Sequence, residues 1–498
     1  MRPFEFLLVL VNLFTFLSLS GILPAGRFVS GIPVLAGLLV AGVQALVEGP
    51  RWQMAPAAVL SALFLPVWIV KYAASVRLTA ETFRLPWLVV LPVALVLVVS
   101  VVLPLSLPVF QFPTPGGPYA VGTVTYHWVD TKRSEFFTPD PDDRREIMVQ
   151  VWYPAAGDVG GRDAPYVEEG RLLGPIARLL GLPEFFLSHL KYITTNAIPF
   201  ASVADEQPQY PVLIFSHGRG GFRQHNTRQV EELVSHGYVV AAIDHPYAAS
   251  GVLFPDGRTA VFDPRMFDPT SPGHPRIYDL ALPYLTQDIL FTLDQLAVVN
   301  ENDPYGILTG RLDMSRTAAF GSSLGGVLAA EACRLDARLQ ACLAMDVFMT
   351  PDVAGQGLRQ PVMWITRDAE TMQQEGWKQF DIEETQTTIR AAFEHTQADA
   401  YLVLAPGMYH TDFSDARFLS PLTAWLGLTG PVDDDLKDAV FLDLPLAFFD
   451  RHLKGQPVEV LDHLTEEYPG LIIERRSSGG WFLSSEAEGV NSPQGADR

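Results

Sequence analysis

Cysteine is nearly absent from this chain of 498 residues, which contains only Cys333 and Cys342. Two cysteines cannot form the disulfide framework of a small secreted domain. One lies on an expected helix and the other in an expected buried strand, which indicates small core residues rather than a bridge or a metal pair. An excess of positive charge is also absent, because the net charge is −21. A chain this acidic repels phosphate backbones, which argues against nucleic-acid binding.

Charge of either sign is scarce in the first 110 residues, which contain six Lys or Arg, three Glu and no Asp. Apolar runs that approach or exceed the ~18–20 residues needed to span a bilayer fill this region. A soluble helix is rarely apolar on every face over such lengths. We therefore expect about four transmembrane helices in residues 1–112, or three if the short third run lies at the interface. The four runs are 4–24, 31–48, 55–70 and 86–110.

The first apolar run is longer than the ~7–15 residues usual in a secretory signal, so we expect it to be retained as a helix. With four spans, the loops near Arg27 and from Lys71 to Arg84 lie on one side of the membrane. These loops hold four basic residues, and the other side holds Arg2 and Arg51. The bias places the large C-terminal region outside the cytoplasm, with the lipid bilayer as partner. The sequence does not indicate the oligomeric state.

After a linker rich in Pro and Gly, the pattern changes to short apolar strands that alternate with helices. Continuous apolar runs are expected of parallel strands that are buried on both faces. The alternation predicts a doubly wound, mostly parallel sheet with helices on both faces in residues 113–476. The expected strands are 122–129, 146–153, 212–216, 238–243, 317–320, 341–345, 362–366 and 400–404. The expected helices are 224–236, 283–300 and 325–335.

Two long insertions, 156–209 and 247–282, interrupt this alternation. Connections of such length are usually covers of a functional site or surface elaborations, and both readings stay open here. The last residues, 477–498, are rich in Ser, Gly and acidic side chains and are predicted to form a disordered tail.

The segment Gly321-Ser322-Ser323-Leu324-Gly325 lies between an expected strand and an expected helix, which is the context of a nucleophile elbow. The turn is so tight that the serine backbone is strained, and the residues two before and two after it must lack colliding side chains. Gly321 and Gly325 satisfy this requirement. Ser322 competes as nucleophile, but the glycine spacing centres on Ser323. The helix N-terminus then points its N–H groups at a developing oxyanion.

A serine nucleophile needs a histidine base that an acid orients, in the chain order Ser, Asp or Glu, His. Of the histidines that follow, His410 comes directly after the last expected strand, at the edge of the sheet where ligands bind. We interpret His395, His452 and His463 as solvated or packing residues. His410 is therefore the predicted base.

The acid has two candidates that the pattern alone does not separate. Asp346 ends the strand 341–345, and Asp368 ends the strand 362–366, the position more common in α/β hydrolases. Asp412, near His410, is expected to be a turn residue.

The run His217-Gly218-Arg219-Gly220-Gly221 follows the strand 212–216, where α/β hydrolases supply an oxyanion donor. We expect the backbone N–H groups of Arg219 and Leu324 to form the oxyanion hole, and His217 to support the loop. Such a pair of donors contributes a few kcal/mol to the stability of the transition state.

From about Gly117 to Lys454 the sequence resembles the platelet-activating-factor acetylhydrolases of the plasma and intracellular type II class. The resemblance implies the α/β-hydrolase fold, favours Asp346 over Asp368, and implies Arg219 as the first oxyanion position. Two departures occur in the elbow: Ser322 stands where the family usually has His, and Leu324 where Phe is common. The segments that carry the resemblance are Gly117-Pro118-Tyr119-Ala120-Val121-Gly122, Val151-Trp152-Tyr153-Pro154, the run from Phe215 to Arg223, the elbow, Asp346 and His410.

The resemblance implies a membrane-anchored ester hydrolase that removes short or modified acyl chains from phospholipids without calcium, a cofactor or another metal. A general carboxylesterase or dienelactone-hydrolase-like enzyme acting on small soluble esters is the alternative within the same class. A membrane binding module that has kept the fold without catalysis is the alternative outside it.

Overall fold

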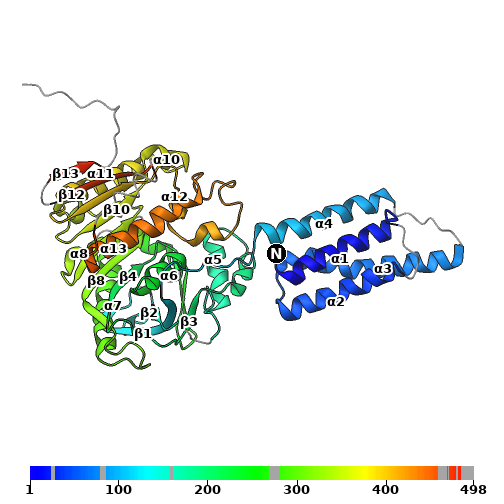
Figure 1. Cartoon of the computed structure of the whole chain (residues 1–498), viewed down its shortest axis with the longest axis horizontal. Helices are drawn as coiled ribbons and strands as arrows, with labels where there is room; N and C mark the ends of the chain where they lie inside the picture. Colours follow the sequence, from blue (N-terminus) through cyan, green and yellow to red (C-terminus); the bar gives the residue numbers. More distant parts are fainter. Residues whose placement is uncertain are drawn as a thin grey trace, which may run out of the picture.

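In the computed structural model, residues 1–23, 29–78, 86–157, 161–267, 281–457, 468, 470–477 and 480–483 are described. The first of them form four helices, α1 (Pro3–Ser20), α2 (Gly31–Val47), α3 (Ala55–Leu78) and α4 (Trp87–Ser106). Figure 1 shows these helices side by side, as a bundle that projects from the rest of the molecule. In the described residues, three segments are long and apolar enough to cross a membrane, Pro3–Ser20, Trp52–Ala74 and Trp87–Ser106, whereas α2 has 17 residues.

The end of the bundle next to the large domain carries buried charges. The Arg51 guanidinium donates to both carboxylate oxygens of Glu5, at 2.6 and 2.7 Å, and to the carbonyl of Leu107 at 2.6 Å. Arg2 also pairs with Glu5, at 2.7 Å. The start of α1, the start of α3 and the end of α4 are therefore tied together at one end of the bundle.

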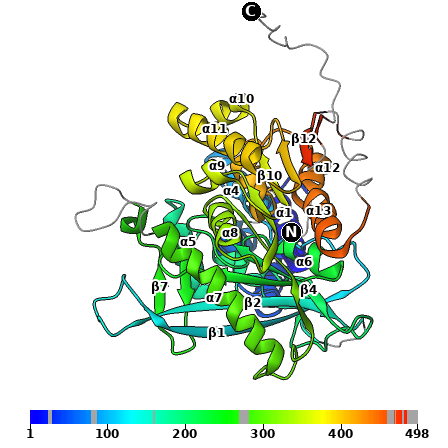
Figure 2. The same cartoon turned by 90° about the vertical axis from the view of Figure 1, so that its left-hand side faces the viewer.

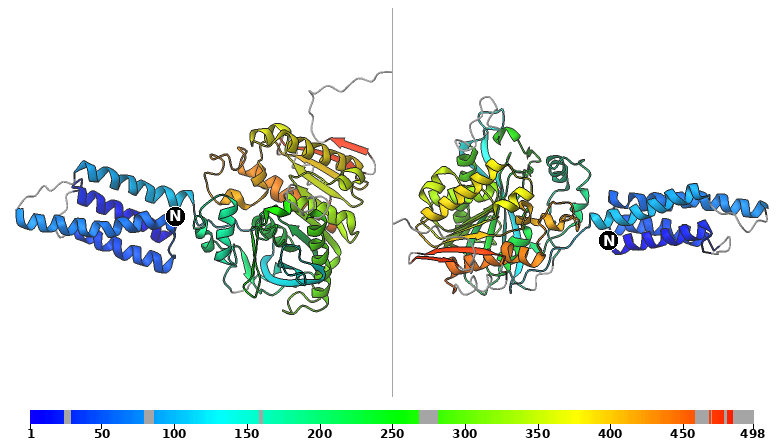
Figure 3. Two further views of the ribbon diagram at one scale, coloured as in Figure 1. Left: turned by 180° about the vertical axis from the view of Figure 1, so that it is seen from behind. Right: turned by 90° about the horizontal axis from the view of Figure 1, so that it is seen from above.

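The bundle contacts the first insertion through aromatic side chains. Trp52 Nε1 donates to the carbonyl of Phe186 at 3.0 Å, and the Tyr192 hydroxyl donates to the carbonyl of Pro50 at 2.7 Å. Figure 3 shows from two further sides that the bundle meets the large domain at one narrow junction. The insertion includes α5 (Leu173–Leu179) and the turn η3 (Ser188–Tyr192), and it lies between the bundle and the sheet in Figure 1.

Eleven strands of the described residues form one sheet, in the order β13-β12-β11-β10-β9-β8-β4-β5-β2-β1-β3. Its centre, from β11 to β5, is parallel, and β2 pairs with β5 in the antiparallel direction. The carboxyl ends of the central strands therefore meet at one edge of the sheet, where ligands bind in open α/β sheets. The strands are β1 (Ala120–Ser134), β2 (Arg144–Ala155), β3 (Ala197–Pro199), β4 (Tyr210–Ser216), β5 (Val239–Asp244), β8 (Leu312–Ser322), β9 (Leu339–Met345), β10 (Val362–Thr366), β11 (Ala400–Leu404), β12 (Ile472–Ser477) and β13 (Gly480–Leu483).

Helices cover both faces of the sheet. Figure 2 shows α7 (Leu282–Glu301), α8 (Leu324–Leu335) and α11 (Gln379–His395) on one side, and α6 (Thr227–Ser235) and α13 (Leu444–Lys454) on the other. Successive residues of a strand point to opposite faces, so Ile214 packs in the core under α7 and α8 while Phe215 packs under α6 and α13. The central strands have nearly continuous apolar runs because both of their faces are buried. This architecture is the α/β-hydrolase fold that the sequence predicts.

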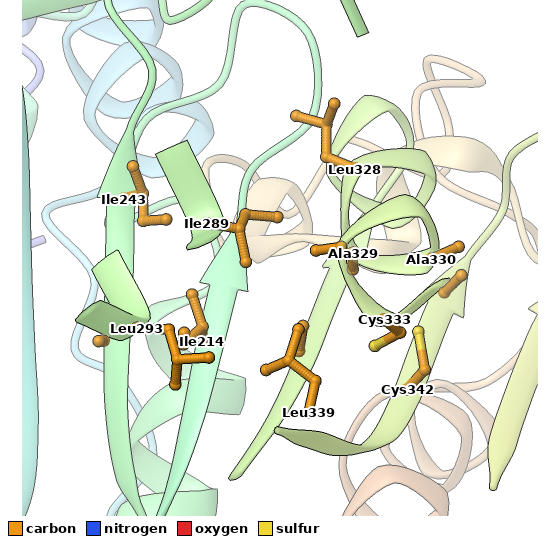
Figure 4. Close-up of a cluster of buried hydrophobic side chains, with 14 of the residues drawn as sticks. Ile214, Ile243, Ile289, Leu293, Leu328, Ala329, Ala330, Cys333, Leu339 and Cys342 are labelled. Carbon is orange, nitrogen blue, oxygen red and sulfur yellow. The ribbon is translucent and has the colours of Figure 1, made fainter. Parts of the chain in front are cut away.

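The two cysteines are free and buried, in agreement with their interpretation as core residues. Figure 4 shows Cys333 of α8 facing Cys342 of β9, in the cluster that also holds Ile214, Ile289 and Leu328. Burial raises the pKa of the Cys342 thiol well above its usual value, so this side chain is not a reactive thiolate.

All eight expected strands are present, with ends that differ by at most a few residues. The short strands β3, β6 (Gly251–Leu253), β7 (Thr259–Val261), β12 and β13 were not expected. The prediction of disorder from residue 477 is wrong for β13, whose backbone pairs with β12 in the antiparallel direction. The rest of that tail lies outside the described residues. The domain boundary at residue 112 stays a prediction.

Candidate active site

Ser323 stands at a sharp turn between β8 and α8, with φ 54° and ψ −130°. A non-glycine residue with positive φ is strained and requires strong support from its surroundings. The support is steric. A Cβ on Gly325 would lie 1.9 Å from the carbonyl oxygen of Ser216, and one on Gly321 would lie 2.5 Å from the same atom. Only glycine fits on either side of Ser323, so the chain has the elbow geometry that the spacing predicts.

His410 follows β11 and begins the short turn His410–Phe413. Its Nδ1 lies 2.6 Å from Oδ2 of Asp346, which directly follows β9 and is 1% exposed. A carboxylate at this distance accepts a hydrogen bond from Nδ1–H, which leaves Nε2 as the basic nitrogen of the ring. The structure thus joins the predicted base to the first of the two candidate acids.

The second candidate acid takes another role. Asp368 caps the helix α10 (Ala369–Gln374), accepting from the backbone N–H of Thr371 at 2.9 Å and from its hydroxyl at 2.6 Å. Asp412 accepts from the backbone N–H groups of Tyr409 and Gly430, as a turn residue does.

The other histidines lie elsewhere. His395 contacts the carbonyl of Ala354 at 2.7 Å, and His452 contacts the hydroxyl of Tyr401 at 3.2 Å. His463 lies outside the described residues. Neither His395 nor His452, the two alternative histidines among the described residues, contacts Asp346 or His410.

A buried arginine, which the sequence analysis did not identify, holds the other side of Asp346. Arg367 Nε donates to Oδ1 of Asp346 at 2.9 Å, and its Nη2 lies 2.9 Å from Oδ2. Arg367 also pairs with Glu375, whose carboxylate accepts from the backbone N–H of His410 at 3.0 Å. Burial alone would raise the pKa of Asp346, but Arg367 and His410 together hold it below its usual value. Asp346 is therefore ionised at neutral pH.

A cavity of about 630 Å³ opens at this edge of the sheet, and both Ser323 and His410 line it. In the described part of the chain, no hydrogen bond joins the side chains of Ser323 and His410. The distance between a nucleophile and its base often shortens to hydrogen-bonding range only when substrate binds. The walls of the cavity are mainly apolar. They include Leu179, Leu187 and Leu190 from the first insertion, Phe262 and Phe267 from the second, and Phe222, Phe413 and Leu419. Both insertions therefore contribute to the cavity wall, rather than only to the outer surface.

The glycine-rich loop after β4 lies directly beside the serine. A Cβ on Gly218 would lie 3.1 Å from Cβ of Ser323. His217 is buried, with its Nδ1 2.7 Å from the carbonyl oxygen of Gly218, and its Nε2 accepts from the backbone N–H of His245. Burial lowers the pKa of His217 well below its ordinary value, so the ring is neutral. These contacts fit the supporting role that the sequence analysis gives to His217.

A second Ser–His–Asp set lies beneath this loop and is fully buried. Ser216 Oγ is 2.8 Å from Nε2 of His245, and Nδ1 of His245 is 2.9 Å from Asp288. Asp288 is itself held by a buried ion pair with Arg145, at 2.6 Å. None of the four side chains lines the cavity, so no substrate reaches Ser216. The set fixes the end of β4, against which both elbow glycines pack.

The fold, together with a serine elbow and an Asp–His pair at one cavity, defines an α/β hydrolase. The family described as platelet-activating factor acetylhydrolase, isoform II, matches residues 106–254 and 287–466. The chain belongs to this family and is an ester hydrolase of its kind. The match begins at residue 106, so α1 to α4 precede the part that the family shares.

Individual relatives agree with the family. The platelet-activating factor acetylhydrolase of Cavia porcellus is 25% identical over 363 residues, covering 68% of this chain and 78% of that protein. The protein of the same name from Gallus gallus is 21% identical, covering 69% and 84%. A solved structure, the ferulic acid esterase from Streptomyces cinnamoneus, is similar with a TM-score of 0.58 and 28% identity, covering 73% of this chain and 99% of that one.

Proposed function

We propose that the chain is a serine ester hydrolase whose catalytic triad is Ser323, Asp346 and His410. Ser323 attacks the ester carbonyl while His410 Nε2 takes its proton, and Asp346 stabilises the imidazolium that forms. His410 then protonates the leaving alcohol, and water releases the acyl group from Ser323 by the reverse sequence. The observation that carries this proposal is that His410, paired with Asp346 at 2.6 Å, lines the same cavity as a strained serine.

The proposed oxyanion hole consists of the backbone N–H groups of Arg219 and Leu324. In the described chain neither N–H donates to a protein acceptor, which leaves both available for substrate. Leu324 is the first residue of α8, so the helix dipole adds to the positive potential there. A Cβ on Gly218 would lie only 3.1 Å from Cβ of Ser323, so the loop after β4 lies close enough to supply the other donor.

The proposed substrate is a lipid ester with a short or modified acyl chain. The largely apolar cavity suits a hydrocarbon chain, and its volume of about 630 Å³ suits a short one. The relatives carry the name platelet-activating factor acetylhydrolase. The proposed steps use a hydroxyl, an imidazole and a carboxylate, so they require no calcium.

The proposed location of the cavity is the membrane surface, with α1 to α4 embedded in the bilayer. The insertion that lines the cavity through Leu187 and Leu190 also contacts the bundle through Phe186 and Tyr192. An exposed apolar side chain occurs at the cavity: Leu180, which lines it, is 59% exposed. Such a group favours contact with lipid over water.

The proposed membrane side follows from the bundle. The N-terminus, the α2–α3 turn and the end of α4 share one end of the bundle, next to the hydrolase domain. The end of α1 and the end of α3, which precede the more basic segments of the sequence, lie at the opposite end (Figure 1), so the positive-inside rule favours a hydrolase domain outside the cytoplasm.

A hydrolase of small soluble esters is the second candidate, and the likeness to a ferulic acid esterase favours it. The purified full-length protein in nanodiscs should be assayed on phospholipids with sn-2 chains of increasing length and on soluble aryl esters. Lipid esterase activity predicts higher kcat/KM for short-chain phospholipids, falling as the chain lengthens. Turnover confined to soluble esters would favour the second candidate.

Labelling with a fluorophosphonate probe tests the nucleophile itself. We expect Ser323→Ala to abolish both labelling and turnover, and Ser322→Ala, the adjacent control, to retain both. Residual activity after loss of the triad serine should not exceed what the oxyanion hole and binding alone supply. Absence of labelling in the wild type would favour a non-catalytic binding module.

A further inference from the structure

The cluster of buried charges behind the triad acid has no part in the proposed proton transfers. Arg367 directly follows β10 and directly precedes Asp368. The strand β10 lies next to β9 in the sheet. The Arg367 side chain is fully buried and turns back to Asp346 rather than towards solvent. Burying a guanidinium is costly, so its placement against the acid requires the ion pairs that it forms.

We propose that Arg367 and Glu375 act as a pair of positioning residues that set, in opposite directions, the proton affinity of His410. Arg367 fixes the Asp346 carboxylate and makes the electrostatic potential at the imidazole less negative. Glu375 makes the same potential more negative. The inference rests on the proposed function, because it assigns the base to His410.

The carboxylate of Asp346 is divided between two partners. Oδ1 accepts from Arg367 Nε at 2.9 Å, and Oδ2 lies 2.6 Å from His410 Nδ1. Rotation of the carboxylate would break both contacts at once, so its plane is fixed. The backbone of Asp346 also has a positive φ of 52°, a strained conformation that side-chain contacts must maintain.

Glu375 connects the arginine to the base along a second route. Its carboxylate pairs with Arg367 through one oxygen and accepts from the backbone N–H of His410 through the other, at 3.0 Å. Trp377 contacts both residues: the Arg367 guanidinium lies 4.8 Å from the Trp377 ring centroid, and the Trp377 and His410 ring centroids lie 5.3 Å apart in a T-shaped arrangement. His410 is therefore held at Nδ1, at its backbone N–H and by the Trp377 ring.

The charged and titratable groups that face His410 come from several elements. Asp346 follows β9, Arg367 follows β10, and Glu375 follows α10. His225 approaches from the loop after β4 and also lines the cavity. Asp412, on the same turn as His410, is offset by Lys437 at 3.5 Å. Among the described residues, Arg367 is the one permanent cation in direct contact with the acid, and Glu375 is its counter-charge.

The sign of each effect follows from Coulomb's law. A cation beside the Asp–His pair disfavours a proton on the imidazole, and an anion favours it. Because the base must be neutral to accept the serine proton, kcat/KM rises with pH as the base loses its proton, and this rise is the acid limb of the pH profile. Removal of Arg367 should move this acid limb to higher pH, and removal of the Glu375 charge should move it to lower pH.

The test compares pH profiles of kcat/KM for wild type, Arg367→Gln, Arg367→Lys and Glu375→Gln in the full-length protein. For Arg367→Gln we expect a loss of about 10- to 100-fold and an upward shift of at least about half a pH unit. Glu375→Gln should shift the limb downward by a similar amount. Arg367→Lys keeps the charge but not the planar fork, so it should lose activity with its limb near the wild-type position.

Arg390→Gln is the matched control, because Arg390 makes a two-nitrogen pair with Glu474, both at 2.6 Å, away from the cavity. We expect it to leave both rate and profile as in wild type. The rate of fluorophosphonate labelling against pH gives the same limb when turnover is too slow to measure. If Arg367→Gln does not fold, the downward shift of the limb in Glu375→Gln, beside an unshifted limb in Arg367→Lys, still decides.

Two outcomes would overturn the inference: both charge variants lose activity with no shift of the limb, or both shift it in one direction. Either would make the cluster purely structural. Failure of the proposed function looks different, because Ser323→Ala would then retain labelling and turnover.

Discussion

The two halves of the candidate site are built by different forces. Ser323 is held directly by main-chain contacts: glycines on both sides bring β8, α8 and the end of β4 close together. His410 is held by charges, since Asp346, Arg367 and Glu375 are all buried or nearly so around it. The nucleophile therefore depends on excluded volume, and the base depends on electrostatics.

This difference determines how each half should fail. Steric contacts between backbone atoms have no pH dependence and cannot be relieved by moving a side chain, so their loss should be all or none. A cluster of charges has several members, and removal of one changes the proton affinities of the others by graded amounts. Substitutions in the two halves should thus differ in kind as well as in size.

The largest effect is expected for Gly325→Ala. The added Cβ would lie 1.9 Å from the Ser216 carbonyl oxygen, so α8 must move away from β4. We expect no detectable labelling of Ser323 and a loss of at least about 2–3 kcal/mol in the free energy of unfolding, measured in urea. Gly355→Ala is the matched control, since nothing lies within 4 Å of its Cβ. Normal labelling of Gly325→Ala would show that the elbow is not held by packing.

The next effect in size distinguishes the two aspartates. Asp346→Asn should lower kcat by about a thousandfold or more, because an amide cannot stabilise the imidazolium and favours the wrong histidine tautomer. Asp368→Asn should change kcat by less than about twofold, since Asn caps a helix as well as Asp does. Steady-state kinetics on a soluble ester compares them. An inactive Asp368→Asn beside an active Asp346→Asn would show that the acid assignment is wrong.

The steric half was predictable from sequence because its signal is local. Gly321, Ser323 and Gly325 lie within five residues, and the flanking strand and helix have clear apolar patterns. His410 was predictable for a related reason, as it directly follows an apolar strand. The central strands are buried on both faces, and this makes their apolar runs continuous and their positions easy to recognise.

The electrostatic half was much less predictable. Asp346 and Asp368 both end strands, and only the family resemblance favoured one of them. What separates them is whether the side chain points into the site or caps its own helix, which depends on one or two backbone angles. Arg367 is 21 positions from Asp346 in the sequence, and Glu375 is 35 positions from His410. No local sequence pattern therefore predicted these two contacts.

A smaller effect concerns acid stability and His225, a half-buried member of the cavity wall. Burial, and then the nearby His410, lowers the pKa of His225 to about 4. In the unfolded chain a histidine has a pKa near about 6.5, so below this pH the unfolded state binds a proton that the folded state does not. Above about pH 6.5 both states hold His225 neutral, and the free energy of unfolding is at its full value. As pH falls towards 4, proton binding by the unfolded state lowers the free energy of unfolding.

Replacement of this histidine should remove that pH dependence. We expect the unfolding free energy of His225→Leu, relative to wild type, to improve by about 2 kcal/mol between pH 7 and pH 5 in urea titrations. Ser322→Ala, in the elbow half, should show no such change with pH. If the unfolding free energies of His225→Leu and Ser322→Ala changed equally with pH, the electrostatic half would not be the source of this pH dependence.

The smallest effect belongs to Gly218→Ala, which tests whether every steric contact in the elbow half is equally strict. Its Cβ would lie 3.1 Å from Cβ of Ser323 and 3.4 Å from the Ser322 carbonyl oxygen, and Gly218 does not have a positive φ. A shift of a few tenths of an ångström relieves such contacts, whereas none relieves 1.9 Å. We expect kcat/KM to fall by about three- to tenfold, with the unfolding free energy within about 1 kcal/mol of wild type. Losses as large as those of Gly325→Ala would mean that the oxyanion loop has no freedom beside the serine, and the steric half would then extend to the whole loop.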